Sequence, residues 1–149
     1  MSATNQFELD LLELLFTNAT APNIGDGTGI AGGTVGTIQV SLHTAAMAET
    51  DTLTTANEAA YAGPYARQTV ARSVAGWTSS SPAGVGTIDN DALITFPTAT
   101  GSETETDFGL TMQTAGDFLQ IFGALTSSLA VSNGVTPEFA TQALAITLD

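Results

Sequence analysis

Residues 38–43 have the sequence IQVSLH, in which apolar and polar side chains alternate. Ile38, Val40 and Leu42 fall on one side of an extended chain, and the residues between them fall on the other. This period of two predicts a β-strand with one buried and one exposed face. The segment marks the start of a long β-rich region.

Short segments of the same kind recur through the rest of the sequence, separated by turn-forming runs such as 79–84 (SSSPAG). The predicted strands lie at residues 65–75, 85–88, 92–96 and 108–112, around Leu119 and Ile121, at 130–131, and at 144–148. Threonine is abundant, and its β-branched polar side chain suits the exposed face of a sheet. We therefore expect a mainly β fold, a jelly roll or β-sandwich of about seven or eight antiparallel strands.

Upstream of these strands, residues 4–16 favour one N-terminal α-helix. Thr4 can act as N-cap, and acidic residues follow in the early turns. Apolar side chains project from several sides of the helix, so its apolar surface is wider than a single sheet would cover. The helix is expected either to be buried in its own domain or to contact another subunit. Its candidate interface residues are Phe7, Leu11, Leu12, Leu15 and Phe16.

The chain of 149 residues has the length of one domain and can bury a sizeable core without disulfides or structural metals. It contains no cysteine, so disulfides and thiolate metal sites are absent from the prediction. We expect a single domain over 1–149, with the helix at 4–16, a glycine-rich loop at 17–36 and a β-sandwich at 37–149.

The charge balance is strongly acidic, with 15 Asp and Glu, 2 Arg, no Lys and a formal net charge of −13. Nucleic acid is excluded as a partner, because phosphate binding depends on clusters of Lys and Arg. A partner with a basic surface would be attracted. No basic leader and no apolar run of ~20 residues is seen, so we expect synthesis in the cytoplasm and no membrane contact.

Arg67 and Arg72 are the only fixed positive charges, and each is expected to be paired. Their opposite parity would place them on opposite faces of a regular strand. An intrachain bridge to an acid such as Glu58 or Asp107 is one interpretation, and a bridge between subunits is the other. Both arginines are therefore candidate interface residues.

Three patterns in the sequence contain residue types that are found in chemical sites. Residues 27–32 satisfy G-x-G-x-x-G, but a helix precedes them and a strand follows, the reverse of a dinucleotide site, so they predict a loop. His43 lies two residues from Ser41 on the same strand, without a nucleophile elbow or an evident orienting acid. A hydrogen bond between the two at a surface or interface is expected rather than catalysis.

The third pattern is acidic: Glu103, Glu105 and Asp107 alternate with threonines and would share one strand face. Like charges there repel unless they are exposed, bound to a cation such as calcium, or met by an arginine of another chain. Solvent exposure is the expected arrangement. No enzyme and no cofactor follows from these patterns.

Several segments together resemble a family of small virion proteins of tailed phages. They are residues 14–18 (LLFTN), 23–26 (NIGD), 40–45 (VSLHTA), 58–61 (EAAY), 65–67 (YAR), 70–72 (VAR), 76–78 (GWT), 94–97 (ITFP), 123–126 (GALT), 129–140 (LAVSNGVTPEFA) and 143–147 (ALAIT). Such proteins are described as capsid decoration proteins, tail-fibre components or structural proteins. The resemblance covers most of the chain.

The resemblance implies a structural protein on the capsid surface of a virion, made in the host cytoplasm. The main hypothesis is a cement protein that binds the major capsid protein and stabilises contacts between capsomers, with many weak contacts adding avidity. Self-association as a homotrimer is expected by analogy. The alternative is a tail-fibre or other tail-associated protein that contacts host glycans, for which Trp77, Tyr61 and Tyr65 are the candidate aromatic residues.

Overall fold

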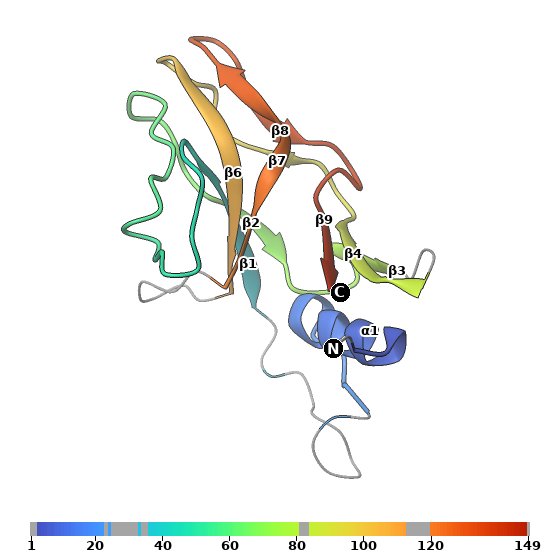
Figure 1. Cartoon of the computed structure of the whole chain (residues 1–149). Helices are drawn as coiled ribbons and strands as arrows, with labels where there is room; N and C mark the ends of the chain where they lie inside the picture. The colour runs from blue at the N-terminus through green and yellow to red at the C-terminus, as the bar shows by residue number, and fades with distance from the viewer. Residues whose placement is uncertain are drawn as a thin grey trace. The chain divides into compact units, whose positions relative to one another are not determined.

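The computed structural model describes residues 3–22, 24, 33, 36–80, 84–112 and 120–148. Over these residues the fold is mainly β, with nine strands and one N-terminal helical segment (Figure 1). The paired strands run antiparallel, which confirms the predicted fold class. The strands form sheets of four, three and two, and the jelly roll itself stays a prediction.

The chain forms two compact units, each built from segments far apart in the sequence. Unit 1 comprises Met1–Thr37, Ala71–Ile94 and Phe139–Asp149. Unit 2 comprises Ile38–Val70 and Thr95–Glu138. Because both units draw on several segments, neither coincides with the predicted division into helix, loop and sandwich. Whether residues 1–149 behave as one domain stays a prediction.

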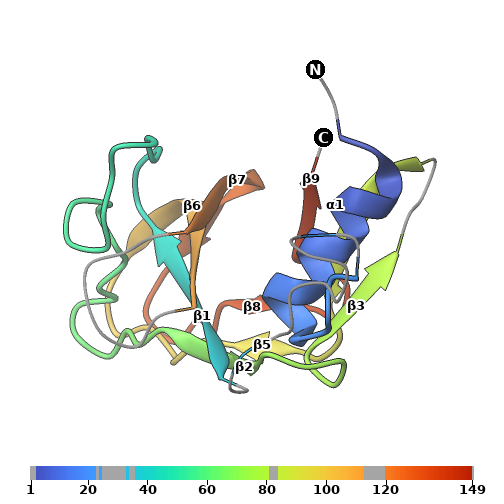
Figure 2. The same cartoon turned by 90° about the horizontal axis from the view of Figure 1, so that it is seen from below.

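Unit 1 packs the helical segment against a three-stranded sheet. The sheet has the order β3-β4-β9, with β3 at Trp77–Ser80, β4 at Gly86–Asn90 and β9 at Ala145–Leu148. Figure 2 shows helix α1 (Asn5–Leu12) lying along this sheet, where it contacts β4 and β3. The large buried apolar side chains of this core are Leu12, Phe16, Trp77, Ile88, Leu144 and Ile146.

The helix begins and ends close to the predicted positions. Thr4 is the N-cap, and its Oγ1 accepts a hydrogen bond from the Phe7 amide at 3.4 Å, as predicted. After α1 the chain continues as a π-helix, η1, over Glu13–Thr17. It ends at Asn18, whose φ of 62° places it in the left-handed region typical of helix ends. The helical segment therefore extends one residue beyond the predicted limit at Phe16.

Unit 2 contains a four-stranded sheet with the order β2-β1-β6-β7. Its strands are β1 (Thr37–His43), β2 (Gln68–Ala71), β6 (Glu103–Thr111) and β7 (Ile121–Val131). In β1 the apolar positions are buried as predicted, but the opposite face is not exposed, because Ser41 and His43 are buried as well. The segment around residues 56–59 lies beside the end of β1, since the Ala59 amide donates to Leu42 O and His43 bridges to Glu58.

Other strands differ from the prediction in length or position. The strand predicted at 65–75 is limited to β2, and Ser79 and Ser80, predicted as part of a turn, belong to β3. Residues 130–131 are the end of the long strand β7, whose pairing with β6 is irregular between Glu105 and Asp107. Leu119 and the glycine-rich pattern at 27–32 lie outside the described residues. β5 (Ile94–Thr95) pairs with β8 (Glu138–Phe139) in the two-stranded sheet.

Candidate functional site

The N-terminal helix is attached to its sheet by polar groups as well as by apolar packing. The Glu8 carboxylate, only 5% exposed, accepts a hydrogen bond from the Gly86 amide of β4 at 3.0 Å. A Cβ at position 86 would lie 2.7 Å from the Glu8 Cβ, so glycine permits this close approach. The helix is therefore part of the structure of unit 1.

The predicted interface residues of the helix fall into two groups. Leu12 and Phe16 are fully buried, and the Phe16 ring meets the Trp77 ring edge-on at 4.7 Å. These two side chains form the core of unit 1 and are not available on its surface. Phe7 is 43% exposed, and Leu11 and Leu15 are half-buried. The interface prediction stays a prediction, and it now depends on these three residues.

The two arginines make different intrachain interactions. In unit 2, Arg67 donates two hydrogen bonds to the Glu58 carboxylate, at 2.7 and 2.6 Å, which is one of the predicted bridges. In unit 1, Arg72 donates from Nε to Leu15 O at 2.6 Å and from Nη2 to Leu14 O. A cation at these carbonyls satisfies acceptors that the end of a helix leaves free. Arg72 therefore closes the helical segment and binds no carboxylate in these contacts.

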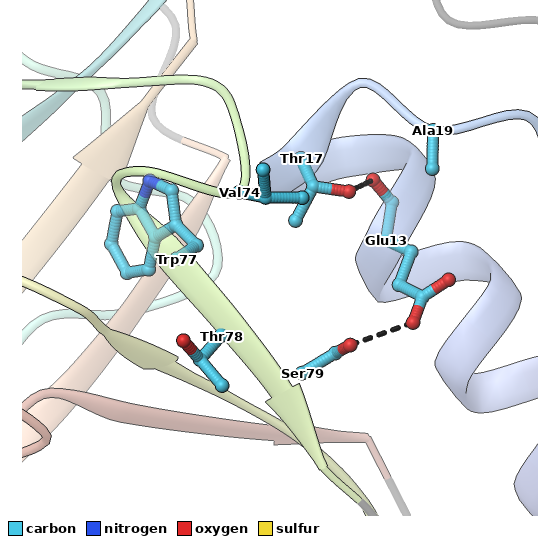
Figure 3. Close-up of a pocket in the computed structure, with 7 residues that line it drawn as sticks. All are labelled: Glu13, Thr17, Ala19, Val74, Trp77, Thr78 and Ser79. Carbon is cyan, nitrogen blue, oxygen red and sulfur yellow. Dashed lines mark hydrogen bonds between the residues drawn. The ribbon is translucent and has the colours of Figure 1, made fainter.

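Beside this helix end, unit 1 contains a pocket of about 280 Å³. Figure 3 shows it between η1, the following turn and β3. Its lining residues are Glu13, Thr17, Ala19, Val74, Trp77, Thr78 and Ser79. The Ser79 hydroxyl donates to Glu13 Oε1 at 2.6 Å, and Thr78 donates to Asp91 Oδ1 at 3.0 Å. The pocket thus combines an acidic group and hydroxyls with apolar surface, and no local pattern in the sequence predicts it.

Of the three aromatic residues that are candidates for sugar binding, Trp77 and Tyr61 have no open stacking face. Trp77 is 1% exposed and its Nε1, within the described structure, has no hydrogen-bond partner. Tyr61 is fully buried against Tyr65, with ring centroids 5.1 Å apart, and Tyr65 in turn stacks on Phe96. Trp77, Tyr61 and Phe96 belong to the cores of their units, whereas Tyr65 is half-buried. Stacking of a sugar needs an exposed ring, which Trp77 and Tyr61 do not offer, and binding of host glycans stays a prediction.

Ser41 and His43 do contact each other, as their spacing predicts. The distance from Ser41 Oγ to His43 Nε2 is 2.8 Å, and His43 Nδ1 lies 2.6 Å from Ala56 O. Burial lowers the pKa of His43, so the neutral ring donates from Nδ1 to the carbonyl and accepts the Ser41 hydroxyl proton at Nε2. Both residues are at most 1% exposed, which is incompatible with attack on a substrate from solvent and corrects the expected surface position.

Two of the three acidic residues on β6, Glu105 and Asp107, are buried and Glu103 is half-buried, which corrects the predicted exposure. Glu103 Oε1 accepts hydrogen bonds from the amides of Ala60 and Tyr61, at 3.0 and 2.8 Å. Glu105 is fully buried, and neither of its oxygens has a hydrogen-bond partner among the described residues. Burial, reinforced by the neighbouring Glu103, raises the pKa of Glu105 to about 8. A carboxyl with this pKa is mostly protonated at neutral pH, which removes much of the expected repulsion.

Asp107, the third member, is 6% exposed. In the part of the chain that the structure describes, no group of three or more His, Cys, Asp or Glu is arranged to hold a metal ion.

The described helices include none with the length and apolarity needed to span a membrane.

Residues 89–91 (DND) form a further acidic stretch, and its central residue has a structural role. Asn90 is fully buried, donates to Ala92 O and Ala140 O, and accepts from the Leu144 amide at 2.8 Å. One amide side chain thereby fixes the C-terminal segment to β4.

Comparison with known proteins gives one match to a protein family. The family model described as Podophage GP4 fiber I protein gp80 matches residues 3–147. No curated protein matches the sequence. The matched range includes both units and almost every residue discussed above.

Proposed function

The chain belongs to the family of podophage GP4 fiber I proteins, and from this premise we propose that it is a structural subunit of a tail-associated fibre. Family membership makes it a structural protein of a phage virion. The description as a fibre protein favours the tail-fibre alternative over the cement hypothesis. The match over residues 3–147 is the observation that carries this proposal.

The geometry supports a structural role for both units. Buried polar side chains bind backbone groups that are remote in sequence: Glu8 binds the amide of Gly86, and Asn90 binds that of Leu144. Such bonds are costly to break, because each would leave a buried polar group unpaired. The one Ser–His pair considered for catalysis is closed to solvent.

A whole-particle reconstruction tests the location. We expect density for the chain in a fibre attached to the tail, and loss of that density in particles assembled without the chain. Particles lacking the chain serve as the matched control for the assignment of density. Regular density on the capsid lattice would refute the fibre proposal and restore the cement hypothesis, with the major capsid protein as partner.

We also propose that the chain associates with itself, as a homotrimer. Support comes from Phe7, which is 43% exposed on the helix beside the half-buried Leu11. Light scattering should give three times the monomer mass of 15.1 kDa, and Phe7→Ser should shift the protein towards monomer without loss of helix. A monomeric mass at high concentration for the unsubstituted chain would contradict this proposal.

A further inference from the structure

The pocket beside η1 has two chemically different parts. Val74, 76% exposed, and Ala19 provide aliphatic surface. Glu13 provides a half-buried carboxylate whose Oε1 already accepts the Ser79 hydroxyl. Figure 3 shows these groups around one hollow, with the Glu13 carboxylate directed towards β3. An occupant that satisfies both parts needs an apolar stem and a polar end.

The charge of the surroundings selects the sign of that polar end. Glu13 is acidic, and the Asp91 carboxylate, which does not line the pocket, accepts the hydroxyl of the lining residue Thr78 at 3.0 Å. Arg72 lies beside the pocket but donates to Leu15 O and Leu14 O, no cation is found among the described residues that line the pocket, and the whole chain carries a formal net charge of −13. A carboxylate or phosphate would be repelled here, whereas an ammonium or guanidinium group would be attracted.

A second copy of this chain is a poor source of that cation. The sequence has no lysine, and its two arginines are engaged within their own units. Arg67 makes a bidentate ion pair with Glu58, and Arg72 closes the helix through Leu14 and Leu15. Removing either arginine from these contacts would leave acceptors unpaired. The cation therefore comes from a different protein.

We infer that this pocket is a docking site for a lysine or arginine side chain of another virion protein. The aliphatic stem would lie along Val74 and Ala19, and the charged end would pair with Glu13. Long basic side chains commonly bury their stems in this way while the charge stays near solvent. The inference does not depend on whether the chain is placed on the tail or on the capsid.

The single tryptophan makes the pocket directly observable. Because the chain has one Trp, its indole N–H gives one NMR signal, and Trp77 lines the pocket. We expect Nα-acetyl-lysine amide to shift this signal with a dissociation constant on the order of millimolar, as for an exposed ion pair with some apolar contact. The affinity should fall as NaCl is raised. The same compound acetylated on Nε, which has no charge, should bind at least threefold more weakly.

Variants separate the pocket from general attraction by an acidic protein. Glu13→Gln keeps an oxygen that accepts the Ser79 hydroxyl but removes the charge, and should weaken lysine binding three- to fivefold. Glu49→Gln changes an exposed carboxylate elsewhere and should leave binding unchanged. Val74→Ser, at an exposed position where the fold tolerates the change, should weaken binding about twofold. Absence of any shift of the Trp77 signal, equal binding of the neutral compound, or equal weakening by Glu13→Gln and Glu49→Gln would each overturn the inference.

Discussion

Replacing Glu105 by glutamine should stabilise unit 2 at neutral and alkaline pH. The carboxyl of Glu105 is fully buried in β6, neither oxygen has a hydrogen-bond partner among the described residues, and Glu103 adds a like charge nearby. Burial of an unpaired carboxylate is unfavourable, so the folded chain retains the proton to higher pH than the unfolded chain does. Glutamine has a similar shape and never ionises.

The magnitude follows from the two protonation equilibria. The pKa of Glu105 rises from an ordinary value of 4.5 to about 8 on folding. Between these values the folded state binds more protons than the unfolded state, so the free energy of unfolding falls as the pH rises. The stability is fully present below pH 4.5, and the loss is complete once the pH has risen through 8. At pH 7 the loss amounts to roughly 3 kcal/mol. Glu105→Gln should recover most of it.

Urea unfolding followed by circular dichroism measures the effect. The free-energy difference between Glu105→Gln and the unsubstituted chain should grow steadily from pH 5 to pH 8. Glu49→Gln, at an exposed position, should show no such difference and serves as control. If the two curves stay parallel across this range, Glu105 is ionised in the folded chain at its ordinary pKa, and the reasoning from burial is refuted.

Three further predictions concern the interiors of the units. Phe16→Ala removes a buried ring packed on Trp77 and should destabilise unit 1 by about 3–5 kcal/mol, measured by thermal unfolding with tryptophan fluorescence. Arg72→Met leaves two helix carbonyls without their donor and should lower the free energy of unfolding by about 1–3 kcal/mol, with faster amide exchange in the N-terminal helix. Arg67→Met, in the other unit, is the control and should leave that exchange unchanged. Burial lowers the pKa of His43, so the stability that depends on its neutral ring is present above pH 6.5 and is lost as the pH falls below 6.5. In urea titrations between pH 7 and pH 5, the His43→Gln variant should therefore lose less stability than the unsubstituted chain.

Local chemistry explains the parts of the structure that were predictable from sequence. Thr4 caps the helix because its side chain reaches an amide three residues away, and the alternation in residues 38–43 places Ile38 and Val40 in the core of the sheet. Contacts within a few residues decide both features. The pairing of Arg67 with Glu58 was predictable for a related reason, since few cations were present to choose from.

Contacts between remote segments decide the features that the sequence did not reveal. Ser79 and Ser80 have turn-forming neighbours, yet pairing with β4 makes them a strand. His43 and Glu105 occupy positions that alternation assigns to solvent, yet both are buried, and His43 pairs with Glu58 from a remote segment. Arg72 binds carbonyls instead of carboxylates because the end of η1 lies beside it. No pattern within one strand contains this information.

The distribution of charge also determines which kinds of assembly the chain can support. Copies that meet through their surfaces bring carboxylates together, because the chain has 15 acidic residues and both arginines are engaged internally. Self-association therefore requires an uncharged contact, such as the surface around Phe7. Ionic contacts, by contrast, require cations from a different protein, and the pocket at Glu13 is the site where we propose that a lysine or arginine side chain binds. Raising the salt concentration should thus weaken attachment to other virion proteins while leaving contacts between copies intact.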